Sequence, residues 1–204
     1  MKISAICFDL GKVLLDFDKE AMLRRVAEKS PLTPAEITAL AANDPQGLAY
    51  ERGDLSTAEF IAHWKKLLRY EGTSEELQAA YSEIFTPLVE NIAIAEALAP
   101  HYPLAIISNT NDAHILHAEA TYPLFQHFPV RIYSHQVRAM KPDGAIYEAA
   151  LAAMGGGIDP REALFIDDLE SNVQGAVRLG WQTIHLRPGV DLRQELIALG
   201  VEGL

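Results

Sequence analysis

The chain has 204 residues, and 49% of them are hydrophobic, which is enough for one α/β core and a small second lobe. Its formal net charge is −11 and it has no basic stripe, so we expect no nucleic-acid partner. The single cysteine, Cys7, excludes a disulfide within the chain and a thiol cluster for zinc or iron–sulfur.

The first apolar segment, Ile3–Phe8, is predicted to be a buried strand that ends just before Asp9. The segment is too short for a signal peptide. No apolar run approaches the roughly twenty residues needed to cross a bilayer. We therefore expect a soluble, cytoplasmic protein with no membrane partner.

The stretch from about Asp18 to Phe85 predicts one helix after another and no convincing strand. The predicted helices cover Lys19–Ser30, Pro34–Ala42, Thr57–Tyr70 and Ser74–Phe85. Turn signals stand at residues 43–45 and 52–54. Apolar residues that recur at helical spacing are expected to pack the core of a small bundle: Phe60, Ile61, Trp64, Leu67 and Leu68. The sequence thus predicts a helical insert after the first strand.

Strands and helices alternate in the rest of the chain, which favours right-handed crossovers and a mainly parallel sheet. The predicted strands are Leu104–Ile107, Val130–Tyr133, Ala163–Ile166 and Thr183–Leu186. Helical patterns cover about 90–99, 111–119, 143–154, 170–179 and 191–199. Pro142 stands where a helix could begin, and Gly180 and Gly200 stand where helices could end.

Polar residues follow three of the predicted strands. Asp9 follows the first, the run Ser108, Asn109 and Thr110 follows the second, and Asp167 and Asp168 follow the fourth in the chain. In an open parallel sheet, ligands bind beyond the carboxyl ends of the strands. These side chains are therefore expected to meet at one edge of the sheet.

Each of these residues also has an ordinary structural explanation. Asp9 and Ser108 could sit in turns, and Asp167 or Asp168 could cap the following helix. Lys141, taken alone, is typical of a solvated surface lysine. Together, however, these explanations require several independent coincidences at strand ends, so a shared site is favoured.

The chemistry of such a site follows from its charges. Crowded carboxylates repel one another unless a cation compensates, and oxygen ligands favour a hard ion such as Mg²⁺. Ser108 and the N–H groups of Asn109 and Thr110 precede a helix and could hold phosphate oxygens. Lys141 would add a positive charge. The predicted result is a charge clamp around a phosphoryl group, with a carboxylate nucleophile at its centre.

Four segments carry this pattern: F-D-L-G-K-V at 8–13, I-I-S-N-T-N at 106–111, M-K-P-D at 140–143 and F-I-D-D-L-E-S-N at 165–172. In this order and spacing, they resemble the motifs of the haloacid dehalogenase-like (HAD) hydrolase superfamily. The E-R-G-D stretch at 51–54 resembles a cap stretch common among the small-cap members. The set is most similar to that of bacterial phosphatases acting on α-D-glucose 1-phosphate, which share the D-L-G first motif, the S-N-T-N second motif and an R-G cap turn.

The resemblance implies an α/β fold with a Rossmann-like three-layer parallel core, residues 1–15 and 87–204, and a helical-bundle cap, residues 16–86. It implies a small phosphorylated substrate and a phosphoaspartyl intermediate on Asp9, with Lys141 as a further catalytic residue. It also implies a Mg²⁺ ion held by Asp9, the backbone carbonyl of Gly11 and the pair Asp167 and Asp168. We expect Asp168 to be the direct ligand of that pair.

One position departs from the family pattern. Most HAD phosphatases carry a second aspartate two residues after the nucleophile as general acid and base, and here that residue is Gly11. Losing such a group typically costs a factor of about 10²–10⁴ in rate. Asp16 and Asp18 are close in sequence and could substitute, or a good leaving group could need less help.

Three hypotheses follow. The first is a Mg²⁺-dependent phosphatase for a small metabolite. The second is a non-catalytic HAD-fold protein that binds a phosphorylated ligand or a partner, with Gly11 marking lost chemistry. The third is a metal-free hydrolytic dehalogenase, which the acidic pair disfavours. The sequence does not fix the phosphate ester or the oligomeric state.

Overall fold

Five parallel strands form the central sheet in the order β5-β4-β1-β6-β7, and the computed structural model describes residues 2–204. The strands are β1 (Ala5–Phe8), β4 (Leu104–Ser108), β5 (Val130–Tyr133), β6 (Ala163–Asp167) and β7 (Gln182–His185). In the register, Cys7 of β1 lies opposite Ala105 of β4 and Phe165 of β6. The α/β class and all five predicted strands are confirmed.

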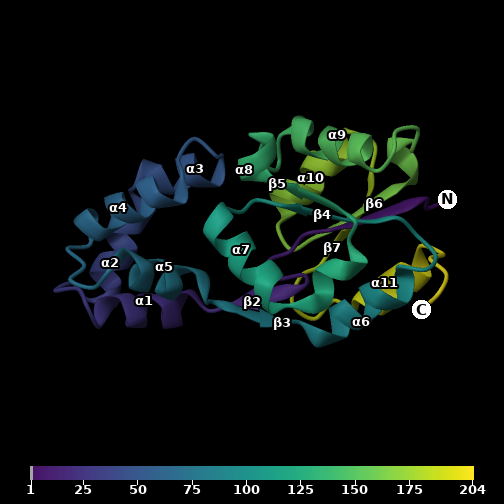
Figure 1. The fold of residues 1–204 in the computed structure, drawn as a ribbon. Coiled ribbons are helices and arrows are strands. Elements are labelled where there is room, and N and C mark those ends of the chain that lie inside the picture. The colour runs from purple at the N-terminus through teal and green to yellow at the C-terminus, as the bar shows by residue number, and fades with distance from the viewer. Residues whose placement is uncertain (1) are drawn as a thin grey trace.

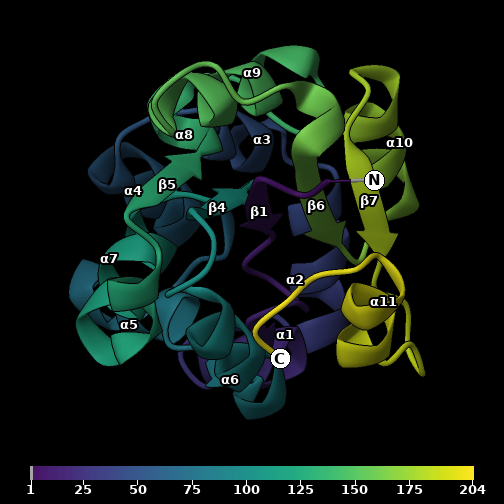
Figure 2. The ribbon, with the colours of Figure 1, turned by 90° about the vertical axis from the view of Figure 1, so that its right-hand side faces the viewer.

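Helices cover both faces of this sheet, so the core has three layers (Figure 1, Figure 2). One face carries α9 (Gly144–Ala153) and α10 (Glu170–Arg178), and the other carries α6 (Val89–Leu98), α7 (Asp112–Thr121) and α11 (Leu192–Ala198). The short α8 (Ser134–Val137) follows β5, and 3₁₀ turns occupy Pro123–His127 and Pro160–Glu162. Gly180 and Gly200 follow α10 and α11 at positive φ and end them as predicted.

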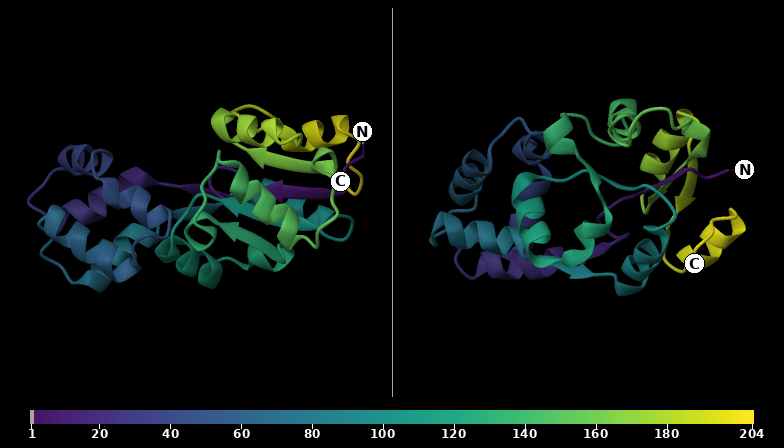
Figure 3. Two further views of the ribbon diagram at one scale, coloured as in Figure 1. Left: turned by 90° about the horizontal axis from the view of Figure 1, so that it is seen from above. Right: turned by 45° about the vertical axis from the view of Figure 1, so that its right-hand side comes forward.

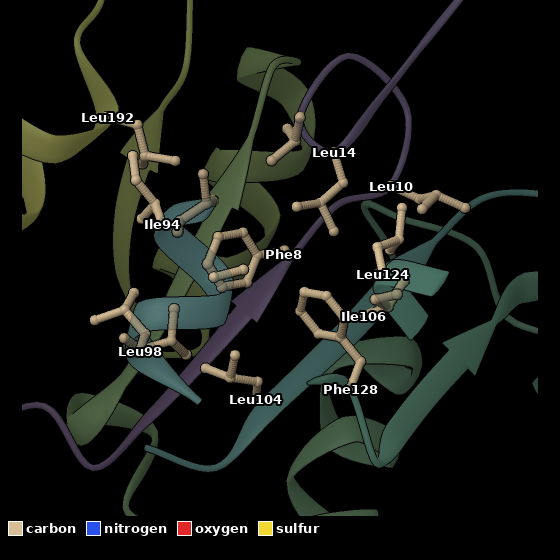
Figure 4. Close-up of a cluster of buried hydrophobic side chains, with 14 of the residues drawn as sticks. Phe8, Leu10, Leu14, Ile94, Leu98, Leu104, Ile106, Leu124, Phe128 and Leu192 are labelled. Carbon is tan, nitrogen blue, oxygen red and sulfur yellow. The ribbon is translucent and has the colours of Figure 1, made fainter. Parts of the chain in front are cut away.

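Side chains alternate between the two faces along each buried strand, as strand geometry requires. Phe8 packs on the face covered by α6 and α11, beside Ile94, Leu98 and Leu192 (Figure 4). Cys7 points to the opposite face and packs in a second cluster beneath α9 and α10. Both faces of β1 are buried, and all of its residues are apolar. The packing of β1 therefore fixes the position of Asp9, the next residue in the chain.

The residues between β1 and α6 form a helical bundle at one end of the sheet (Figure 3). Its helices are α1 (Lys19–Ala27), α2 (Pro34–Ala42), α3 (Pro45–Glu51), α4 (Thr57–Leu67) and α5 (Ser74–Ser82). Capping boxes begin α2, α4 and α5. The bundle has its own core, in which the predicted Phe60, Ile61, Trp64 and Leu68 are buried and Leu67 is partly buried.

Two features of this insert differ from the sequence prediction. The turn signal at 43–45 begins α3, because Asp44 caps a helix whose first residue is Pro45. Strands β2 (Leu15–Phe17) and β3 (Phe85–Pro87) pair antiparallel where the chain enters and leaves the insert. Three-residue strands are too short to show an alternating pattern. No helix in residues 2–204 has the length and apolarity that a membrane span needs.

Candidate active site

A cavity of about 410 Å³ lies where the carboxyl ends of the strands face the helical insert. Of the predicted site residues, seven line it: Asp9, Gly11, Ser108, Asn109, Thr110, Lys141 and Asp168. Asp167 does not line the cavity, and its side chain is fully buried behind it. The parallel arrangement of β1, β4 and β6 explains this convergence, since their carboxyl ends share one edge.

Lys141 connects two of the carboxylates. Its Nζ lies 2.8 Å from Asp9 Oδ1 and 2.6 Å from Asp167 Oδ2, and its side chain is only 1% exposed. Asn109 holds the backbone of Lys141 on both sides: its Oδ1 accepts from the Lys141 N–H at 2.7 Å, and its Nδ2 donates to the Lys141 carbonyl at 2.9 Å. Sequence reasoning predicted a phosphate contact for Asn109 and missed this positioning of the lysine.

Asp9 keeps one oxygen available. Its Oδ1 accepts from the Leu10 N–H at 2.7 Å and pairs with Lys141, whereas its Oδ2 has no partner within residues 2–204. Burial raises the pKa of Asp9 to about 7, and Lys141 opposes that rise. A second cation beside Asp9, in addition to Lys141, would therefore favour its anionic form at neutral pH.

The two acids at the end of β6, Asp167 as its last residue and Asp168 just after it, differ in what they can offer. Asp167 Oδ1 accepts from the Leu169 N–H at 2.8 Å and from Asn172 Nδ2 at 3.0 Å, and its Oδ2 is taken by Lys141. The carboxylate of Asp168 has no hydrogen-bond or ion-pair partner within the described chain. Burial and the neighbouring Asp167 raise the pKa of Asp168.

The acidic cluster fits a hard divalent cation. Asp9, Asp167 and Asp168 each offer an oxygen, and these atoms all lie within 4.8 Å of one another. Lys141 offsets only part of this negative charge. Oxygen donors with uncompensated charge are the ligands that Mg²⁺ prefers. The cluster is the one such group of acid, histidine or cysteine residues found in residues 2–204.

The end of β4 and the loop that follows it provide the other side of the cavity. The Ser108 side chain is buried, and its hydroxyl has no hydrogen-bond partner within residues 2–204. The N–H of Thr110, predicted to hold a phosphate oxygen, instead donates to Ser134 Oγ at 2.9 Å. Ser108 therefore offers a free hydroxyl to the cavity, whereas the Thr110 N–H is already engaged.

The structure also brings residues of the insert to this cavity that sequence reasoning did not assign: Phe17, Lys19, Glu51, Ile84 and Phe85. Glu51 begins the E-R-G-D stretch, for which the sequence alone predicts no chemical role. Asp16 and Asp18 do not line the cavity. Asp16 pairs with Lys12, and Asp18 caps α1 by accepting from the Ala21 N–H at 2.8 Å.

Known proteins with similar sequences or folds include two phosphatases and a HAD family enzyme. The D-ribitol-5-phosphate phosphatase of Bacteroides thetaiotaomicron is 29% identical over 97% of this chain and 98% of its own. A phosphorylated carbohydrates phosphatase of Thermotoga maritima is 27% identical over 90% of this chain and 84% of its own. The crystal structure of a HAD family enzyme from B. thetaiotaomicron covers 96% of this chain and 99% of that one, with a TM-score of 0.86 and 25% identity.

The family model for haloacid dehalogenase-like hydrolases matches residues 3–180, a span that contains every residue placed in the cavity above. Phosphatases are among its relatives of nearly full length. The chain belongs to the haloacid dehalogenase-like hydrolase family and is a hydrolase of the phosphatase type.

Proposed function

We propose that this protein is a Mg²⁺-dependent phosphohydrolase that acts on small phosphorylated metabolites through Asp9. The observation that carries the proposal is the buried contact of Lys141 with Asp9, beside the free hydroxyl of Ser108 in one cavity. Two relatives are named for ribitol 5-phosphate and for phosphorylated carbohydrates, so sugar and polyol phosphates are the first candidate substrates.

The side chains suggest how the reaction would run. The Ser108 hydroxyl and the Lys141 ammonium would hold phosphoryl oxygens and place the phosphorus in front of Asp9. The unpartnered Oδ2 of Asp9 would attack the phosphorus as the bond to the leaving oxygen breaks, giving an aspartyl phosphate. Water would then attack that phosphorus, releasing phosphate and the Asp9 carboxylate.

Mg²⁺ would be held by Asp9, Asp168 and the backbone carbonyl of Gly11, with Asp167 beside them, and would offset the negative charge between carboxylate and phosphoryl group. The fit of the acidic cluster to such an ion supports this assignment. A variant of the related B. thetaiotaomicron HAD enzyme, 25% identical, has been crystallised with magnesium and inorganic phosphate.

We also propose that residues 16–86 act as a cap over a core of residues 1–15 and 87–204. The separate hydrophobic core of α1–α5 supports this division. So do the paired strands β2 and β3, which join the two parts. The cap would then face the leaving group, since Phe17, Lys19 and Glu51 line the cavity from that side.

A phosphate-release screen over sugar phosphates, polyol phosphates, nucleotides and acyl phosphates, with Mg²⁺ or EDTA, tests the proposal. We expect release only with Mg²⁺, and none from Asp9→Asn. Asp16→Asn, which removes a nearby carboxylate outside the cavity, is the matched control and should remain active. Unchanged release by Asp9→Asn would refute the nucleophile, and binding of phosphate without turnover of any substrate would favour the non-catalytic hypothesis.

A further inference from the structure

The structure shows why residue 11 cannot supply the missing acid and base. A Cβ added at Gly11 would lie 3.1 Å from Cε1 of Phe17, so the aromatic ring would have to move by a few tenths of an ångström to admit a side chain there. The two nearby aspartates are also engaged outside the cavity, Asp16 by Lys12 and Asp18 as the cap of α1. A proton donor for the leaving group must come from elsewhere.

Four protonatable side chains line the cavity besides Asp9, Lys141 and Asp168: Lys12, Lys19, Glu51 and His114. His114 is already used on both ring nitrogens, with Nδ1 3.2 Å from Asn111 Nδ2 and Nε2 3.2 Å from the Tyr81 carbonyl oxygen. Burial lowers the pKa of His114 to about 4, so its ring is uncharged at neutral pH and has no acidic proton to give. Lys12 pairs with Asp16, and Lys19 lies on the exposed rim against Phe17.

Glu51 differs from these three. Its carboxylate is partly buried and has no hydrogen-bond or ion-pair partner within residues 2–204. Burial raises its pKa, and the charge of Lys19 on α1 opposes that rise. On α5, the hydroxyl of Tyr81 is the other titratable group that this carboxylate affects. Glu51 therefore keeps its proton to a higher pH than an exposed glutamate does, which favours a role as proton donor.

The backbone around Glu51 is fixed on the core. The Glu51 carbonyl accepts from the buried Ser134 Oγ at 2.6 Å. Two residues later, Gly53 has φ +81° and packs so closely that a Cβ there would lie 2.0 Å from the carbonyl oxygen of His135. This close approach requires glycine. The turn after α3 thus holds Glu51 against the cavity.

We propose that Glu51 is the general acid and general base of this phosphatase, acting from the helical insert in place of residue 11. The inference rests on the proposed function. As Asp9 Oδ2 bonds to phosphorus and the ester P–O bond breaks, the Glu51 carboxyl gives its proton to the leaving oxygen. The Glu51 carboxylate then takes a proton from the water that attacks the aspartyl phosphate. The products are alcohol and phosphate, and Asp9 and Glu51 return to their starting states.

A pair of aryl phosphates separates this role from substrate recognition. Phenyl phosphate and p-nitrophenyl phosphate have similar shapes and no hydroxyl groups, but nitrophenolate leaves without a proton whereas phenolate needs one. We expect Glu51→Gln to slow the first turnover of saturating phenyl phosphate at least about 10²-fold. The first-turnover burst of p-nitrophenol should be little changed. The steady-state rate after the burst should be slow, because the glutamine of this variant cannot take a proton from the water that hydrolyses the aspartyl phosphate.

Asp54→Asn removes one carboxylate from the same turn and is the matched control, since Asp54 is exposed and does not line the cavity. It should behave as wild type, and thermal unfolding should show that both variants are folded. Equal slowing of both first turnovers by Glu51→Gln, or no slowing of phenyl phosphate, would overturn the assignment. Absence of turnover by the wild-type protein would overturn the proposed function itself, and the inference with it.

Discussion

The ring of Phe17 occupies the space beside the Cα of Gly11, with Cε1 at 3.1 Å and Cδ1 at 3.6 Å from the position of an added Cβ. Two ammonium groups approach the same ring, Lys12 Nζ at 4.5 Å and Lys19 Nζ at 5.3 Å from its centroid. These cation–π contacts favour the present ring position. The present position of the Phe17 ring therefore depends on residue 11 having no side chain.

Restoring an aspartate at position 11 should be costly for that reason. We expect Gly11→Asp to lower the free energy of unfolding by about 1 kcal/mol or more, because the added side chain must displace the ring. Combined with Phe17→Ala, the same substitution should cost less. Urea denaturation of the two single variants and the double variant measures this coupling, and strictly additive effects would contradict the proposed contact.

Lys141 should contribute strongly to stability when no metal is bound. In Lys141→Met, Asp9 and Asp167 would lose a shared buried cation, so unfolding in EDTA should be easier by about 3–5 kcal/mol. Lys12→Met removes an exposed ion pair with Asp16 and should cost no more than about 1 kcal/mol. Chemical denaturation compares the two, and equal costs would argue against the buried clamp.

The two acids at the end of β6, Asp167 and Asp168, should respond differently to metal. Ligand at 100 times its dissociation constant stabilises a protein by about 2.7 kcal/mol, so Mg²⁺ should raise the melting temperature of the wild type. Asp168→Asn should lose most of this rise while melting normally in EDTA, because its carboxylate has no partner in residues 2–204. Asp167→Asn should melt lower even in EDTA, since Asp167 holds Lys141 and Asn172. Thermal melts with a Mg²⁺ titration would show the contrast, and a full Mg²⁺ response in Asp168→Asn would contradict it.

Much of this arrangement could be predicted from the sequence because it depends on local patterns. Apolar runs such as Ala163–Asp167 identify the strands, and parallel pairing brings their carboxyl ends to one edge. The residues at the carboxyl ends of those strands, including Asp9 and Ser108, are therefore identified by the sequence as candidate site residues. Their roles as nucleophile, phosphate contact and metal ligands remain predictions.

Contacts between the insert and the core could not be predicted in the same way. Glu51 reaches the cavity only because α3 exists and because the turn after it packs on His135 and Ser134, which are more than eighty residues away in sequence. The engagement of the Thr110 N–H by Ser134 is likewise a tertiary contact. Neither contact produces a periodic pattern in the sequence, because each forms only when two elements far apart in the chain pack together.

His114 should make stability depend on pH in the acidic range. Burial lowers its pKa from 6.5 to about 4, so between these values the unfolded chain binds a proton that the folded chain does not. Stability should therefore fall as pH drops from about 6.5 to 4, by about 2–3 kcal/mol from this group. His114→Gln should flatten that part of the curve, and His117→Gln on the same helix is the control. Unfolding curves between pH 4 and 7 that keep the same slope in His114→Gln would exclude this origin.

Ser134 should couple the insert to the core. Its buried Oγ donates to the Glu51 carbonyl at 2.6 Å and accepts from the Thr110 N–H at 2.9 Å, so Ser134→Ala would leave both groups without a partner. We expect a loss of about 1–3 kcal/mol of stability. Turnover of phenyl phosphate should fall more than affinity for inorganic phosphate, because Glu51 would lose its fixed position while Ser108 and Lys141 would not.

The matched control for Ser134→Ala is Ser82→Ala. Ser82 is also buried, but its Oγ donates to the Gln78 carbonyl within α5 and joins no second element. This variant should change stability only and leave the ratio of turnover to phosphate affinity as in the wild type. Steady-state kinetics with phosphate as inhibitor measures both quantities. If the two variants change turnover and phosphate affinity alike, the hydroxyl of Ser134 supports folding without positioning Glu51. The insert must then be coupled to the core by other contacts, such as the hydrogen bond from the Ala113 N–H to the Tyr50 hydroxyl.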